Sequence, residues 1–135
     1  MYGCNVYNDE EIEGQGFMMI VTVHSFIQNK LENHSHSFEG KGLFNKKTLS
    51  FIENEIHMEL QIEKDKIVLK RRTEKKEEFC FTFQEKKNTF LLYCGTIGNL
   101  QIPLYTERLI QENGKIEIDY ILNEKEKFFF KIIYE

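Results

Sequence analysis

Residues 95–120 read Gly-Thr-Ile-Gly-Asn-Leu-Gln-Ile-Pro-Leu-Tyr-Thr, then Glu-Arg-Leu-Ile-Gln-Glu-Asn, then Gly-Lys-Ile-Glu-Ile-Asp-Tyr, and this stretch decides the fold. Two runs place an inward-type residue at every second position: Leu100, Ile102, Leu104 and Thr106, then Ile116, Ile118 and Tyr120. A period of two is typical of a β-strand with one buried face. We therefore predict two amphipathic strands in this stretch.

The rest of the chain supplies further strands outward from this stretch. Eight segments have the composition or alternation of strands: 19–28, 35–45, 48–53, 56–62, 67–71, 79–83, 88–94 and 127–134. Residues 106–112 could instead form one turn of helix, and no other window has a helical period. Short links favour a meander, and a meander hides its edges by closing. We predict an all-β fold, an antiparallel up-and-down β-barrel of about 8–10 strands.

The domain organisation follows from the charge distribution. Residues 1–17 contain four acids and no Lys or Arg, without any periodic pattern. We interpret 1–17 as a poorly ordered leader and 18–135 as a single β-barrel domain. The composition changes at Met18 and Met19, which motivates the hypothesis that one of them is the physiological start.

Composition also narrows the partners and the compartment. The chain has 22 acids and 18 bases, so removing the four leader acids leaves residues 18–135 formally neutral. Such a body has no net field that attracts nucleic acid or anionic lipid. Three widely spaced cysteines without Cys-x-x-Cys, and no signal or membrane segment, favour a reducing cytoplasm. We predict a cytoplasmic protein with no nucleic-acid partner and no membrane partner.

Glycine and proline mark where the sheet departs from regularity. Gly40 and Gly42 lie inside one predicted strand, where glycine usually accompanies a bend or a close backbone approach. Pro103 is the one proline and removes a ladder hydrogen bond. We expect the barrel to bulge or open near Pro103.

Four motifs in order resemble the uncharacterised bacterial YwiB-like proteins. They are Gly40-Lys-Gly42, Leu69-x-Arg71, Thr96-x-Gly98-x-Leu100-x-Ile102 leading to Thr106, and Gly114-x-Ile116-x-Ile118-x-Tyr120. The resemblance covers about 19–135 and implies a lipocalin-like, or calycin, β-barrel. The family pattern has a glycine after the arginine, where this chain has Arg72-Thr73. The resemblance implies no catalytic or binding residues, because the family has none assigned.

Arg71 is the main candidate for a binding residue. It shares parity with Ile67 and Leu69, so its side chain is predicted to point inward, where an unpaired guanidinium is costly. One interpretation is that Arg71 holds a ligand carboxylate, with Thr106, Tyr120 and Tyr134 as supporting hydroxyls. The other is that the strand ends first and Arg71 closes the barrel mouth by bonding carbonyls or a carboxylate.

The remaining polar patterns favour structural roles. His34 and His36 share one strand parity, with His24 on the neighbouring strand, but no acid or thiol at ligand spacing completes a site, so we predict solvated histidines and no metal. The run from Lys70 to Glu78 interleaves bases and acids, which is typical of a solvated turn rather than a nucleic-acid site.

The candidate reactive residues also favour structural roles. Cys80 and Cys94 lie in apolar strands without a nearby histidine and are predicted to be buried thiols. Glu117 and Asp119 face outward and form no acid/base dyad.

Two hypotheses about function, and a weaker third, follow. The first is a non-enzymatic barrel with no cofactor that binds a small, partly apolar or amphiphilic carboxylate through Arg71, Thr106 and Tyr120. The second is a structural or interaction module with a filled core and a working edge near Pro103, pairing as a homodimer. The third is an enzyme that acts on a small anionic substrate.

Overall fold

Ten β-strands form the computed structural model, which describes residues 18–135. In chain order they are β1 (Met19–Asn29), β2 (His34–Phe44), β3 (Thr48–Glu53), β4 (Ile56–Ile62), β5 (Ile67–Arg72), β6 (Glu78–Phe83), β7 (Asn88–Gly95), β8 (Gly98–Glu112), β9 (Lys115–Leu122) and β10 (Glu126–Tyr134). The described residues contain no helix, hence none that could cross a membrane.

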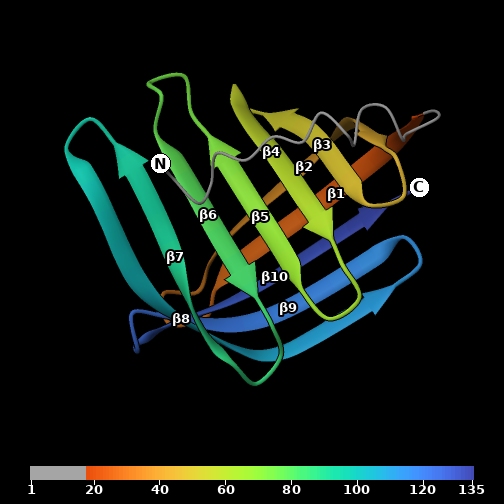
Figure 1. The fold of residues 1–135 in the computed structure, drawn as a ribbon. Coiled ribbons are helices and arrows are strands. Elements are labelled where there is room, and N and C mark those ends of the chain that lie inside the picture. Colours follow the sequence, from red (N-terminus) through yellow and green to blue (C-terminus); the bar gives the residue numbers. More distant parts are fainter. Residues whose placement is uncertain (1–17) are drawn as a thin grey trace.

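The strands form a closed antiparallel barrel. Each strand pairs with the next in sequence, and β1 pairs with β10 to complete the ring. In Figure 1, β4 to β7 cross in front of β9, β10 and β1, so the barrel has two facing sides. The predicted up-and-down barrel is confirmed. The predicted leader, residues 1–17, lies outside the described residues. The hypothesis that Met18 or Met19 is the physiological start stays a prediction.

The interior is built from alternate residues of every strand. Its fully buried side chains include Val23, Leu49, Leu60, Ile67, Phe83, Leu104, Ile116, Ile118 and Ile132. Aromatic rings fill much of the remaining space, and several pack on each other, among them Phe38 on Phe51 and Phe81 on Phe83. Burying each such side chain contributes roughly 1.5–3 kcal/mol. This apolar interior holds the two sides of the barrel together.

β8 carries the largest irregularity of the barrel. It pairs with β7 over its first half and with β9 over its second, so it runs along both sides of the barrel (Figure 1). A register shift between Thr106 and Arg108 leaves Glu107 as the extra residue of a bulge. Before the bulge even-numbered residues face inward, and after it Leu109 does. The alternative of a helical turn at 106–112 is therefore wrong.

At Pro103, β8 is regular on its β7 side but open on its β9 side, because the pairing with β9 begins only at Leu104. Pro103 pairs with Phe90 without a register shift, and the bulge lies beyond it at Glu107. The carbonyl of Pro103 accepts a hydrogen bond from the backbone N–H of Asn123, in the turn after β9. Because a strand residue points its N and C=O to the same side, the missing N–H faces away from β7. The β7–β8 ladder therefore loses no bond.

Not all the residues of 95–120 that were predicted to face inward are buried. Leu104 is buried, but Leu100 is 53% exposed, because the β7–β8 hairpin extends beyond the core. Alternation predicts which face a residue shares, but it cannot predict where the opposite side of the barrel ends.

The seam between β2 and β3 is the shortest ladder in the barrel. Only three residue pairs join these strands, from Gly42 opposite Phe51 to Phe44 opposite Leu49. A Cβ atom on Gly42 would lie 2.9 Å from both the Ser50 carbonyl oxygen and a Val23 methyl carbon. The close backbone approach expected at this glycine is therefore present.

Candidate functional site

Arg71 lies on β5 between Met58 of β4 and Phe79 of β6. The strand continues through it, so it keeps the inward parity of Leu69. Its guanidinium carbon is 5.8 Å from the centroid of the Phe79 ring. Its Nε atom is buried and has no hydrogen-bond partner within the described part of the chain. No carboxylate among residues 18–135 forms a salt bridge with it.

Tyr120 points into the aromatic centre of the barrel. It is 4% exposed, and its ring stacks on Phe128 at 5.2 Å and packs on Phe83 at 4.9 Å between centroids. Burial raises the pKa of the Tyr120 hydroxyl well above its ordinary value, and the charge of Arg71 opposes that shift. The Arg71 charge therefore acts on the hydroxyl of Tyr120.

Thr106 lies opposite Tyr120 on the neighbouring strand β8. It is fully buried, and its Oγ1 atom has no hydrogen-bond partner within the described residues. Its backbone is bonded to the turn between β6 and β7. The Thr106 carbonyl accepts a bond from Lys86 N at 2.7 Å, and its N–H donates to Lys87 O at 3.3 Å. The side chain thus has a fixed position and an unused hydroxyl.

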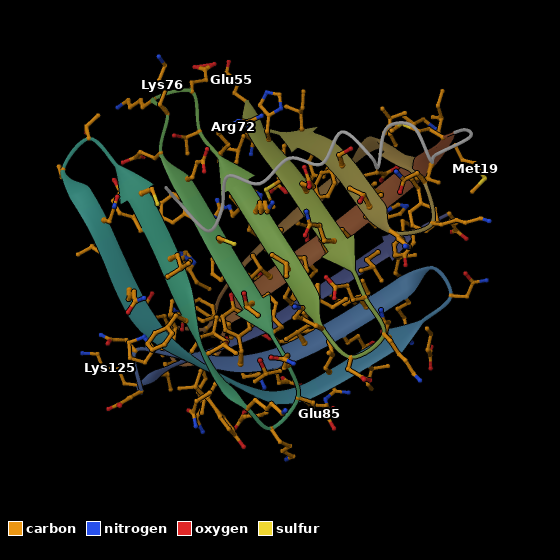
Figure 2. The ribbon with its side chains drawn as sticks, viewed as in Figure 1. Met19, Glu55, Arg72, Lys76, Glu85 and Lys125 are labelled. Atoms are coloured by element: carbon orange, nitrogen blue, oxygen red, sulfur yellow. The ribbon has the colours of Figure 1, made fainter. Side chains whose placement is uncertain are left out.

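The three candidates form a line along the barrel rather than one cluster. Figure 2 shows Arg72, the neighbour of Arg71, at the same end as Lys76, with Glu85 at the opposite end. Thr106 bridges to Glu85 and so lies towards that opposite end. Tyr120 pairs with Thr106 across the β8–β9 ladder, so it lies at the same level of the barrel as Thr106. A molecule that touched all three would be elongated.

Tyr134, the third hydroxyl considered, belongs to another part of the core. Its ring packs on Phe44 with 5.0 Å between centroids. Burial raises the pKa of its hydroxyl, and a hydrogen bond with the Gly114 backbone opposes that shift. These contacts give Tyr134 a structural role.

A cavity of about 500 Å³ reaches Arg71. Inward-facing Phe51 and Met58 contribute to its lining, but most of its lining faces outward, including Ile20 and Leu43. Its volume lies in the range of small-molecule sites, about 300–1,000 Å³. The Arg71 end is therefore the accessible end of the candidate line.

His24 and His36 each lie beside one carboxylate. His36 Nε2 is 2.6 Å from Glu53 Oε2, and Ser25 donates to the other oxygen of that carboxylate at 3.5 Å. His24 lies 3.8 Å from Glu39. No group of three or more metal-ligating side chains occurs within residues 18–135. Glu53 and His36 instead connect β2 and β3 where their ladder has ended.

An ion-pair network on the outer face was missed in the sequence. Asp119 accepts hydrogen bonds from Lys30 at 2.7 Å and from Arg108 at 2.6 Å, and Arg108 also bonds Glu117 at 3.3 Å. Burial alone would raise the pKa of Asp119, but these two cations lower it below its ordinary value. The only sequence signal was a pair of acids two residues apart on one strand face. The two carboxylates bind the cations of Lys30 and Arg108 and so link β9 to β8 and to the turn after β1.

The other motifs occupy ordinary positions. Cys80 is buried and Cys94 is partly buried. The charged run forms the β5–β6 turn with the ends of its flanking strands, and its Glu77 accepts a hydrogen bond from the Tyr93 hydroxyl at 2.7 Å. That bond, above all, raises the pKa of Tyr93.

The barrel is similar to one solved structure, the crystal structure of the ywiB protein from Bacillus subtilis. The two chains are 17% identical, the alignment covers 87% of this chain and 90% of the other, and the TM-score is 0.68. The likeness establishes a YwiB-like fold, as the sequence motifs predicted. No protein-family model and no curated protein matches the sequence.

Proposed function

We propose that this protein is a non-enzymatic, calycin-like barrel that binds a small, partly apolar carboxylate through Arg71. One observation carries the proposal: Arg71 points inward, and its buried Nε has no partner within the described residues. A buried guanidinium nitrogen without a partner is costly, and a carboxylate is the group that best compensates it.

The neighbours of Arg71 suit an amphiphilic acid. A carboxylate can accept two parallel bonds from the guanidinium, and the hydroxyl of Tyr120 supplies a further donor. The ring of Phe79, which lies beside the guanidinium, offers apolar contact to the rest of the ligand. The free hydroxyl of Thr106, deeper in the barrel, suits a second polar group at the far end of an elongated ligand.

The proposal includes a structural superfamily and a cellular compartment. We assign the chain to the lipocalin-like, or calycin, barrels and to a bacterial cytoplasm. This assignment is supported by the closed up-and-down topology and by the three cysteines without a disulfide framework. Fold analogy supports ligand binding only as a class of function.

The interaction module is the second candidate, and the packing of the interior favours it. Aromatic side chains occupy the region between Arg71 and Thr106, including Phe81, Phe83 and Tyr120. If those rings do not move apart, the barrel is a scaffold, and its outer surface binds the partner. Enzymatic action on a small anion is the third and weakest candidate.

Isothermal titration calorimetry with fatty acids of six to twelve carbons tests the proposal. Lys127→Ala is the control, because it removes an equal charge from an exposed, outward-facing position of β10 that does not line the cavity. We expect Arg71→Ala to weaken binding at least about tenfold and Lys127→Ala to change it less than about twofold. Equal affinity of wild type and Arg71→Ala would reject the role of Arg71, and absence of binding throughout would favour the interaction module.

A further inference from the structure

β2 has an unpaired backbone edge although the barrel is closed. All eleven residues of β2 pair with β1, but only Gly42 to Phe44 pair with β3. β3 ends at Glu53, so β2 continues past it toward the β1–β2 turn. Within residues 18–135, no strand pairs with the other side of residues 34–41.

Backbone hydrogen bonds identify which groups of β2 face that open side. Thr22 of β1 exchanges two backbone bonds with Glu135, at 2.8 and 3.1 Å, next to β10. Backbone groups alternate sides along a strand, so Thr22 faces β10 and Val23 faces β2, where it meets Gly40. Even-numbered residues of β2 therefore face β1. The N–H and C=O groups of Ser35, Ser37 and Glu39 face the open side.

A second open edge, on β8, is protected. Residues 98–103 pair with β7, but the pairing of β8 with β9 begins only at Leu104. Pro103 lies at the end of this edge, and its nitrogen, on the side away from β7, has no hydrogen to donate. On that side its carbonyl accepts a bond from Asn123. Proline on an edge is a common device against strand pairing. The β2 edge has no proline.

We propose that the β2 edge pairs with the same edge of a second copy of this chain. An antiparallel pairing about a two-fold axis at Ser37 places Ser35 opposite Glu39 of the other copy. The three residues of each copy then form hydrogen-bonded pairs, with six backbone bonds in total. A twofold axis makes the contact self-complementary, as in most homodimers.

The charges of the edge fit a second copy. Among the three residues that pair, only Glu39 is ionised, and it meets a serine rather than another acid in this register, so no like charges are opposed. His24 lies 3.8 Å from Glu39 on its own chain and offers it a partner of the opposite sign when protonated. The contact is small, since few residues of each strand take part, and falls at the weak end of protein interfaces. We expect a dissociation constant on the order of 0.1 mM.

Charge substitutions at Ser35 test the register without changing the backbone. Ser35 is exposed and faces Glu39 of the other copy in the proposed pairing. We expect Ser35→Lys to tighten the dimer and Ser35→Glu to weaken it, each by about threefold or more at low salt. Sedimentation velocity of the full chain from 10 µM to 1 mM, on the order of the expected constant, measures both.

Ser37→Pro tests the use of the backbone edge itself. The substitution removes an N–H that bonds nothing within the barrel, and we expect it to weaken the dimer at least about tenfold. Ser37→Ala, which keeps that N–H, should leave the dissociation constant within about twofold. A monomer at 1 mM, or equal constants for Ser35→Lys and Ser35→Glu, would overturn the proposal. The Ser35 pair decides the matter if Ser37→Pro does not fold.

Discussion

Two adjacent arginines on β5 differ only in the side of the sheet that they face. Arg72 is exposed, whereas Arg71 keeps the inward parity of Leu69 and has its Nε buried. Inward parity was predictable from the alternation along the strand. The lack of an internal partner was not, because it depends on which side chains the closed barrel brings opposite Arg71.

Thr106→Val should separate the cost of an unpaired hydroxyl from its use. Thr106 Oγ1 is buried without a partner in the described chain, so valine should stabilise the free protein by about 1 kcal/mol. Thr89→Val is the control, because Thr89 donates to the Thr82 carbonyl at 2.5 Å and its loss should cost about 1 kcal/mol. Urea unfolding of both variants provides the measurement. Equal destabilisation by the two would show that Thr106 has a partner in solution.

At the scale of the element, β8 shows what alternation along the sequence can and cannot predict. The existence of the strand and its inward residues Leu104 and Thr106 followed from a period of two. The bulge at Glu107 did not, because the parity change that it causes is hidden among polar residues from 105 to 108. Pro103 indicated where β8 loses its β9 partner but not the bulge, since its nitrogen faces away from β7 and the β7–β8 register runs through it unshifted.

Gly42→Ala tests the close approach at the β2–β3 seam. The added Cβ would meet the Ser50 carbonyl oxygen and a Val23 methyl carbon, each at 2.9 Å, and backbone atoms have little room to move. We expect a loss of about 1–3 kcal/mol in the free energy of unfolding. Ser37→Ala, on the open part of the same strand, should change it by less than about 0.5 kcal/mol. Similar stability of the two variants would mean that the seam opens freely.

At the scale of the whole molecule, barrel closure was predictable from the sequence, but the ion pairs between residues distant in the sequence were not. Ten short strands with short links favoured a closed meander, and the topology has that order. The link between Lys30 and Asp119 joins residues 89 positions apart. Nothing in the sequence indicates that these two residues pair, because their proximity arises only when β1 and β10 close the ring. The same holds for the open β2 edge, which results from the shortness of β3.

The Asp119 network should make stability depend on pH in the acid range. The pKa of Asp119 in the folded chain is below its ordinary value of 3.8, so its contribution is complete above about pH 4. It is lost as pH falls through the folded-state pKa. Asp119→Asn should cost about 2 kcal/mol at pH 7, and the difference from wild type should shrink below pH 4.

Urea unfolding between pH 2 and pH 7 measures that difference. Glu112→Gln is the control, since it removes an exposed pair with Lys115 and should cost less than about 0.5 kcal/mol. A difference between Asp119→Asn and wild type that is independent of pH would contradict the assignment to the carboxylate.

Native mass spectrometry tests the central claim, a carboxylate held by Arg71, most directly. The wild-type chain, Arg71→Ala and the control Lys127→Ala would be purified from the protein's own host and compared before and after denaturation. We predict a bound small acid on the wild type and on Lys127→Ala, and its loss from Arg71→Ala. The same bound species on all three chains, or on none of them, would contradict the claim.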